Sequence, residues 1–274
     1  MKHTAFARVT LFLTCLLSTG GLARGALYGD YTGNGSDGAG GVVGRGTLHL
    51  QEQGGTIAGT LTPGTSYFND CVVLYIDSRA GGFTDNTGFT DTLDAQRRAV
   101  SGCLNRDNRS TARFATGFTA DFALVLSTQY GCGLYELHNG GDESLTLLRT
   151  LSMSQVGAAY QFGINWEEIG VTGDAAHYLA FESTYITATG YRSLESYETI
   201  AGQRGFGGTV TWSNFNTFGL APVPEPTNLA LAVFGVLGLT GGVVSGIGGL
   251  RRAAVQRKTC TAAVGQPSPT DSVA

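Results

Sequence analysis

A glycine-rich acidic stretch near the start of the chain carries residue types that can bind a cation. It reads GDYTGNGSDGAGG over residues 29–41, and it offers oxygen ligands from Asp30, Asn34 and Asp37. Ca²⁺ favours such hard oxygen ligands. The spacing departs from the D-x-[DN]-x-[DN]-G loop, and tight turns are equally rich in Asp, Asn and Gly. We favour a set of turns, which more often explain such a composition, and therefore expect no cofactor, with a calcium site as the alternative.

Catalytic groupings are harder to find. Glu167 and Glu168 follow Trp166, and a pair of carboxylates beside an aromatic ring is typical of glycoside hydrolysis. Neighbouring residues of a helical turn point about 100° apart, so the two carboxylates cannot face one sugar. We expect a solvated turn with Trp166 packed inward. We therefore expect no enzyme, although a carbohydrate-active enzyme with carboxylates far apart in the sequence remains the alternative.

Other residues with reactive side chains are scattered. The three histidines of the body, His49, His138 and His177, lack the close spacing of a metal-binding pair, and no G-x-S-x-G motif occurs. Five aromatic residues late in the body could form a sugar-stacking platform, but β-domains usually bury such side chains, and we expect burial. These five residues are Tyr185, Tyr191, Tyr197, Trp212 and Phe215.

Charge limits the class of partner. Residues 27–221 contain 10 Arg and no Lys against 19 Asp plus Glu, a net charge of −9, whereas the whole chain carries −4. Nucleic-acid binding needs a cationic face, so an acidic body argues against nucleic acid as a partner.

The elements that would position these residues are strands. Apolar or alternating stretches of about five to ten residues are separated by Gly, Asn and Asp. Helical patterns appear only at 91–100 and 165–170, so residues 26–221 predict an all-β domain, a single antiparallel sandwich of eight to eleven strands. The expected strands are 46–52, 56–62, 71–77, 121–127, 133–138, 144–152, 157–165, 177–187 and 207–215.

The N-terminal segment has the pattern of a signal peptide. Lys2 and Arg8 precede an apolar run at 9–17, and Ala23 and Gly25 place small side chains before a cut at residue 26. The apolar run is too short for a stable membrane span. We expect residues 1–25 to be removed during export.

A second apolar segment lies near the C-terminus, after a proline-rich linker at 222–228. Residues 229–250 carry no charge and would span about 33 Å as a helix, enough to cross a bilayer. Basic residues follow at once but do not precede it. The positive-inside rule then places the tail 251–274 in the cytoplasm and the β-domain outside.

The linker, the span and the basic cluster together resemble the PEP-CTERM sorting signal of Gram-negative bacteria. Pro224, Glu225 and Pro226 supply the tripeptide, and Arg251 and Arg252 supply the cluster. The resemblance implies processing by a membrane-embedded exosortase. It also implies a place at the cell surface or in an extracellular polysaccharide matrix. Members usually end soon after the arginines, whereas this chain continues for 22 residues.

The body shows a second, weaker resemblance. A strand ends in Tyr-x-Asp at 72–83, an Ala-Asp-aromatic strand follows at 119–127, and a strand at 160–174 leads into a Trp-bearing turn. This order is similar to that of the family-nine carbohydrate-binding modules and DOMON domains. The resemblance implies a jelly-roll-like sandwich that presents a sugar, or in some relatives haem, and it assigns no ligand residue here.

Cysteine usage fits export. Cys71, Cys103 and Cys132 would lie in an oxidising compartment, where one disulfide and one leftover thiol are expected. Three pairings are open. We favour Cys103–Cys132, because both flank the strand 121–127, and the alternative is three buried free thiols.

Overall fold

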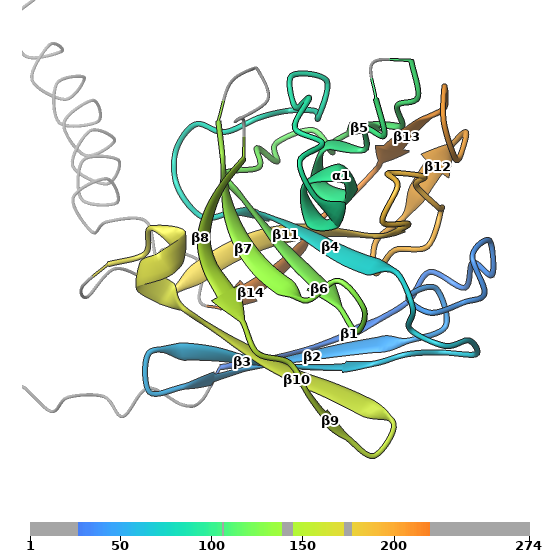
Figure 1. Cartoon of the computed structure of the whole chain (residues 1–274). Coiled ribbons are helices and arrows are strands. Elements are labelled where there is room, and N and C mark those ends of the chain that lie inside the picture. Colours follow the sequence, from blue (N-terminus) through green and yellow to red (C-terminus); the bar gives the residue numbers. More distant parts are fainter. Residues whose placement is uncertain (1–26, 106, 139–144, 173–176, 220–274) are drawn as a thin grey trace, which may run out of the picture. The chain divides into compact units, whose positions relative to one another are not determined.

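Strands dominate the part of the chain that the structure describes. The structure is a computed structural model that describes residues 27–105, 107–138, 145–172 and 177–219 (Figure 1). No helix within these ranges has the length and apolarity that crossing a bilayer requires. Several predicted segments lie outside the described residues: the signal peptide 1–25, the linker 222–228, the apolar segment 229–250 and the tail 251–274, and with them Pro224, Glu225, Pro226, Arg251 and Arg252.

One sheet has five antiparallel strands in the order β1-β2-β3-β10-β9. Alternation decides which face is buried: Ile57, Gly59 and Leu61 of β3 point inward, while the residues between them are half-exposed. Gly54 and Gly55 join β2 to β3 with φ values of 58° and 86°, the left-handed pair that a two-residue hairpin requires. The strands are β1 (Tyr28–Thr32), β2 (Thr47–Gln53), β3 (Thr56–Thr62), β9 (Ser154–Val156) and β10 (Ala159–Asn165).

A second sheet has six strands in the order β14-β11-β4-β6-β7-β8. After β10 the chain returns to place β11 beside β4, so β11, β4, β6 and β7 lie in the spatial order of a Greek key. The strands are β4 (Cys71–Asp77), β6 (Phe122–Ser127), β7 (Cys132–Leu137), β8 (Leu145–Leu151), β11 (Tyr178–Ile186) and β14 (Asn216–Gly219).

The central strands β4 and β6 of the six-stranded sheet are buried on both faces, which explains their continuous apolar runs. On one face Leu74 and Leu124 meet Ile57 of the five-stranded sheet in a shared core. On the other face Val73 and Val125 pack in a second core. Helix α1 (Ala95–Ser101) and a small sheet of β12 (Ile200–Gly202), β13 (Thr209–Trp212) and β5 (Thr111–Arg113) supply the opposite side of that core.

The all-β prediction is confirmed, and all nine expected strands form. The prediction of one antiparallel sandwich with eight to eleven strands is wrong in detail. The described residues form fourteen strands in three sheets, and β13 pairs with β5 in parallel. The additional strands β1, β5, β9, β12 and β14 have three to five residues each, too few to show a period.

Both expected helical stretches also form. Helix α1 begins after Asp94, whose carboxylate accepts the Arg97 backbone N–H at 2.8 Å, and ends at Gly102 with φ 70°. The second stretch is a 3₁₀ turn, Trp166–Ile169, in which Trp166 is buried and Glu167 is exposed, as predicted. Glu168 caps the turn through the Asn165 backbone N–H and pairs with Arg149 at 2.9 Å.

Candidate functional site

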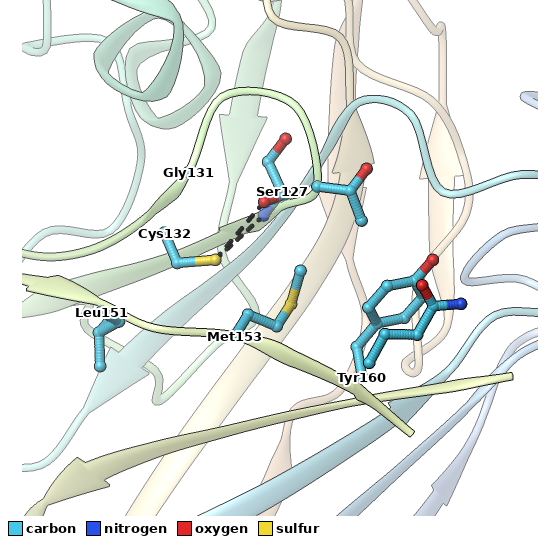
Figure 2. Close-up of a pocket in the computed structure, with 8 residues that line it drawn as sticks. Ser127, Gly131, Cys132, Leu151, Met153 and Tyr160 are labelled. Atoms are coloured by element: carbon cyan, nitrogen blue, oxygen red, sulfur yellow. Dashed lines mark hydrogen bonds between the residues drawn. The ribbon is translucent and has the colours of Figure 1, made fainter. Parts of the chain in front are cut away.

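A pocket of about 370 Å³ opens between the two large sheets (Figure 2). One wall comes from the turn between β6 and β7 in the six-stranded sheet. The other comes from the end of β8 and the segment that carries the chain over into the five-stranded sheet. The lining residues are Ser127, Thr128, Gly131, Cys132, Leu151, Met153, Gln155 and Tyr160.

The first wall is a tightly hydrogen-bonded turn. Ser127 Oγ accepts the backbone N–H groups of Gln129 at 3.3 Å and Tyr130 at 3.1 Å. Gly131 then adopts φ 77°, which a residue with a Cβ rarely does. Thr128 Oγ1 donates to the carbonyl of Phe68, which ties the turn to the β3–β4 connection. These hydrogen bonds hold the wall in place without a bound ligand.

The second wall presents a ring and a thioether. Tyr160, near the start of β10, is half-buried, and its ring meets that of Phe68 edge to face at 5.5 Å. Met153 lies between β8 and β9 and is also half-buried. Figure 2 shows Met153 reaching from this wall toward the turn that carries Ser127, and the Tyr160 ring on the same wall. The pocket therefore has an aromatic side and a hydroxyl-bearing side.

The lining of this pocket is electrically neutral. None of its eight residues is Asp, Glu, Lys, Arg or His. Burial raises the pKa of the Cys132 thiol, so this group too is uncharged at neutral pH. Hydroxyl and amide groups beside an aromatic ring suit a neutral ligand with both polar and apolar faces, because the groups can donate and accept while the ring covers C–H surface.

Two other hollows differ in their chemistry. One, of about 340 Å³, lies beside Asp77, Arg79 and Tyr178. Its Arg79 is already held by Glu136 at 2.7 Å. The other, of about 280 Å³, lies beside Trp166, Glu167 and His177. Each of these hollows is lined by a single carboxylate, Asp77 in the first and Glu167 in the second.

The three predicted calcium ligands are engaged separately. Asp30 pairs with His49 at 2.6 Å, and Asp37 pairs with Arg45 at 2.8 Å. Asn34 donates to the carbonyl of Leu194 at 2.9 Å. Among the described residues, no group of three or more His, Cys, Asp or Glu side chains is placed to hold a metal ion. The structure does not bring the three side chains together, so the calcium prediction gains no support from it.

The glycine-rich loop binds an internal carboxylate. Glu195 is fully buried, and its Oε1 accepts the backbone N–H groups of Ala39 at 2.6 Å and Gly41 at 2.8 Å. Its Oε2 accepts those of Val43 at 3.1 Å and Gly44 at 3.4 Å. Backbone N–H groups that converge in this way form a nest for an anion. The loop that suggested a cation site is therefore built around negative charge.

The predicted Cys103–Cys132 disulfide is not formed. Cys71, Cys103 and Cys132 are all buried free thiols in the structure. Cys132 belongs to the core between the two large sheets, whereas Cys103 contacts the carbonyl of Phe89, which belongs to the core on the opposite face of the six-stranded sheet. Flanking the same strand did not bring the two sulfurs together, because the sheet separates them.

Burial accounts for most of the late aromatic residues, as predicted. Tyr185, Tyr197 and Trp212 are buried, while Tyr191 is partly exposed and Phe215 is half-buried. The three histidines each meet a different carboxylate: His49 meets Asp30, His138 meets Glu136, and His177 meets Glu52.

Two further buried carboxyl groups lie outside what the sequence predicted. Glu182 is fully buried on β11; one oxygen accepts the Ala115 backbone N–H at 2.8 Å, and the other has no partner. Burial raises the pKa of Glu182 to about 9. Burial also raises the pKa of Glu198, which accepts from Ser183 and Asn216. A lone Glu is usually exposed, both in a strand such as β11 and in a connection such as the one that carries Glu198, so the sequence holds little signal for either group.

Searches against protein-family models, curated proteins and solved structures found no match to this chain.

Proposed function

We propose that this chain is an exported, non-enzymatic surface protein whose β-domain binds neutral polysaccharide. The observation that carries the binding step is the pocket formed by Ser127, Thr128 and Tyr160, which joins an aromatic ring to uncharged donors and acceptors. A charged ligand would find no partner of opposite sign there. The acidic body also disfavours polysaccharides that carry carboxylates or sulfates, because like charges repel.

The cellular location that we propose rests on the sequence alone. The basic and apolar start of the chain supports export, and the charge-free segment 229–250 followed by arginines supports a membrane anchor or exosortase processing. We also propose that the β-domain is related to jelly-roll-like sugar-binding sandwiches, which the Greek-key order around β11 and β4 supports.

The alternative, a secreted glycoside hydrolase, needs two carboxyl groups about 5 to 9.5 Å apart across the sugar. The neutral pocket is lined by no carboxylate and each of the other two hollows by one, which favours binding over hydrolysis.

Binding can be tested with the full-length chain in a mild detergent, applied to an array of neutral oligosaccharides (β-1,4-glucan, β-1,3-glucan, xylan and mannan) and of alginate. We expect binding to at least one neutral series and none to alginate. Tyr160→Ala should abolish it, whereas Tyr28→Ala, at a tyrosine on the far edge strand β1, should not. Binding to alginate alone, or to nothing on the array, would contradict the proposal, and release of reducing sugar would favour the enzyme instead.

The proposed cellular location is tested separately. A periplasmic reporter fused after residue 219 should be active, and the same reporter fused after residue 274 should be inactive before processing. An active cytoplasmic reporter after residue 219 would refute export.

A further inference from the structure

Two exposed tyrosines lie beside the neutral pocket. Tyr67 is 89 % exposed on the connection between β3 and β4, and Tyr130 is 41 % exposed on the turn between β6 and β7. Both connections lie toward the same side of the molecule in Figure 1. Tyr130 precedes Gly131, which lines the pocket. Tyr67 precedes Phe68, which does not line the pocket but packs its ring against the lining residue Tyr160. Large exposed rings near one opening are a frequent mark of a binding surface.

The backbone that carries Tyr67 is anchored to both walls of the pocket. Phe68 is buried, its ring packs against Tyr160, and its carbonyl accepts the hydroxyl of Thr128. The ring of Tyr67 is nevertheless left in solvent. Its position is therefore fixed at the backbone, while the ring itself has no packing role in the described part of the chain.

The backbone of Tyr130 is anchored by helix α1. Its carbonyl accepts the side-chain amide of Gln96 on α1 at 2.7 Å. The amide oxygen of Gln96 in turn accepts the hydroxyl of Tyr135 at 2.8 Å. The helix thus holds the turn that presents the Tyr130 ring, so little backbone freedom would be lost when a ligand covers the ring.

The size of the pocket limits how much of a polymer it can hold. About 370 Å³ is near the lower end of the roughly 300 to 1,000 Å³ that drug-sized ligand sites occupy. A polysaccharide that places one part in the pocket must continue over the surrounding surface. Tyr67 and Tyr130 carry large exposed rings on the two connections that adjoin the pocket.

We propose that Tyr67 and Tyr130 are sugar-stacking residues that extend the pocket, so that the ligand is an internal stretch of a neutral polysaccharide bound over several units. This inference rests on the proposed function. It adds that affinity grows with chain length and that the two exposed rings, rather than the pocket alone, produce the growth. Each ring acts through the apolar face of a sugar unit, which it removes from water.

Oligosaccharides of two, three, four and six units from the best-binding neutral series provide the test, with full-length chains that carry Tyr67→Ala, Tyr130→Ala, both, Tyr160→Ala or the control Tyr28→Ala. Tyr28 is 72 % exposed and lies on β1, at the edge of the five-stranded sheet away from β10. It therefore controls for loss of an exposed ring. Circular dichroism and thermal melting would confirm that each variant folds.

For the wild-type chain we expect the six-unit ligand to bind at least tenfold more tightly than the two-unit ligand. Each of Tyr67→Ala and Tyr130→Ala should weaken binding of the six-unit ligand about five- to tenfold and leave the two-unit ligand unchanged. Equal affinity for both lengths, or full six-unit affinity in the double variant, would overturn this inference while a loss in Tyr160→Ala still supported the proposed function. Failure of the wild-type chain to bind any length would overturn the proposed function itself.

Discussion

Glu195 accepts a 2.8 Å hydrogen bond from the backbone N–H of Gly41, a residue 154 positions earlier in the chain. The same carboxylate binds three more N–H groups of the loop. Val42 and Val43 of this loop pack into the core between the two large sheets, and this one side chain holds the backbone around them. The stability of residues 37–45 should therefore depend on Glu195 as well as on these two valines.

Removal of this carboxylate should destabilise the protein strongly. Glu195→Ala leaves four backbone N–H groups without their acceptor, and an unsatisfied buried group costs about 1 to 3 kcal/mol. Water entering the opened loop will recover part of that cost, so we expect a loss of about 3 kcal/mol in the free energy of unfolding, measured by urea denaturation. Glu167→Ala, at an exposed glutamate, should change it by less than about 0.5 kcal/mol. Equal effects of the two substitutions would contradict the role assigned to Glu195.

The loop should also be indifferent to calcium. Its inward-facing groups are N–H donors, which repel a cation, and Asp37 and Asp30 are paired with Arg45 and His49. We expect excess EDTA, and calcium added back at millimolar concentration, to leave the melting temperature unchanged. A fall of several degrees in EDTA that calcium reverses and magnesium does not would reinstate the predicted calcium site.

Stability should fall as pH rises because of Glu182. Its pKa is about 9 in the folded protein against an ordinary value of 4.5, so between these values the folded state holds a proton that the unfolded state has lost. The stabilisation is complete below pH 4.5 and is lost as pH rises through about 9, at about 1.4 kcal/mol per pH unit for one proton. Glu198 acts in the same direction, because burial raises its pKa too.

Glu182→Gln should make this dependence shallower. Urea denaturation at pH 6, 7 and 8 would measure the free energy of unfolding. As pH rises, this free energy should fall less in Glu182→Gln than in the wild-type chain, whereas Glu167→Gln should behave as the wild type does. An unchanged slope in Glu182→Gln would mean that the proton is held elsewhere.

The three thiols of the β-domain should resist modification. Burial raises the pKa of Cys71 to about 12 and also raises those of Cys103 and Cys132, so little thiolate exists at neutral pH. We expect iodoacetamide to label these residues slowly in the native protein and rapidly in urea, as read from peptide masses. A Cys103–Cys132 cross-linked peptide in a non-reducing digest would restore the predicted disulfide.

The sequence predicts best those elements whose own residues determine them. The alternating pattern of β3 reflects burial on one face of the strand, and the apolar run of β4 reflects burial on both faces. Asp94 supplies a local cap for α1. Short strands such as β5 and β12 have no such internal signal. They form because the segments around them are held together by distant contacts, and the parallel pairing of β5 with β13 is one of these.

The site was harder to predict for the same reason. Tyr160 and Ser127 are ordinary residues in ordinary strands, and only the packing of two sheets brings them to one pocket. The acidic side chains of the glycine-rich loop suggested a bound cation, whereas its backbone N–H groups bind the carboxylate of Glu195. The sequence shows the side chains but not the direction of the N–H groups. The segment 192–198 looks like an exposed acidic connection, yet Arg192, Glu195 and Glu198 within it are all buried.

The bond between Glu195 and Gly41 also has a consequence for the order of folding. A ribosome that adds about 5 to 20 residues per second needs roughly 8 to 30 seconds to travel from Gly41 to Glu195. Until then the early loop lacks the acceptor of its N–H groups, although β1, β2 and β3 can already pair with one another. High contact order of this kind slows folding, and slow folding of the nascent chain would favour the export that we propose.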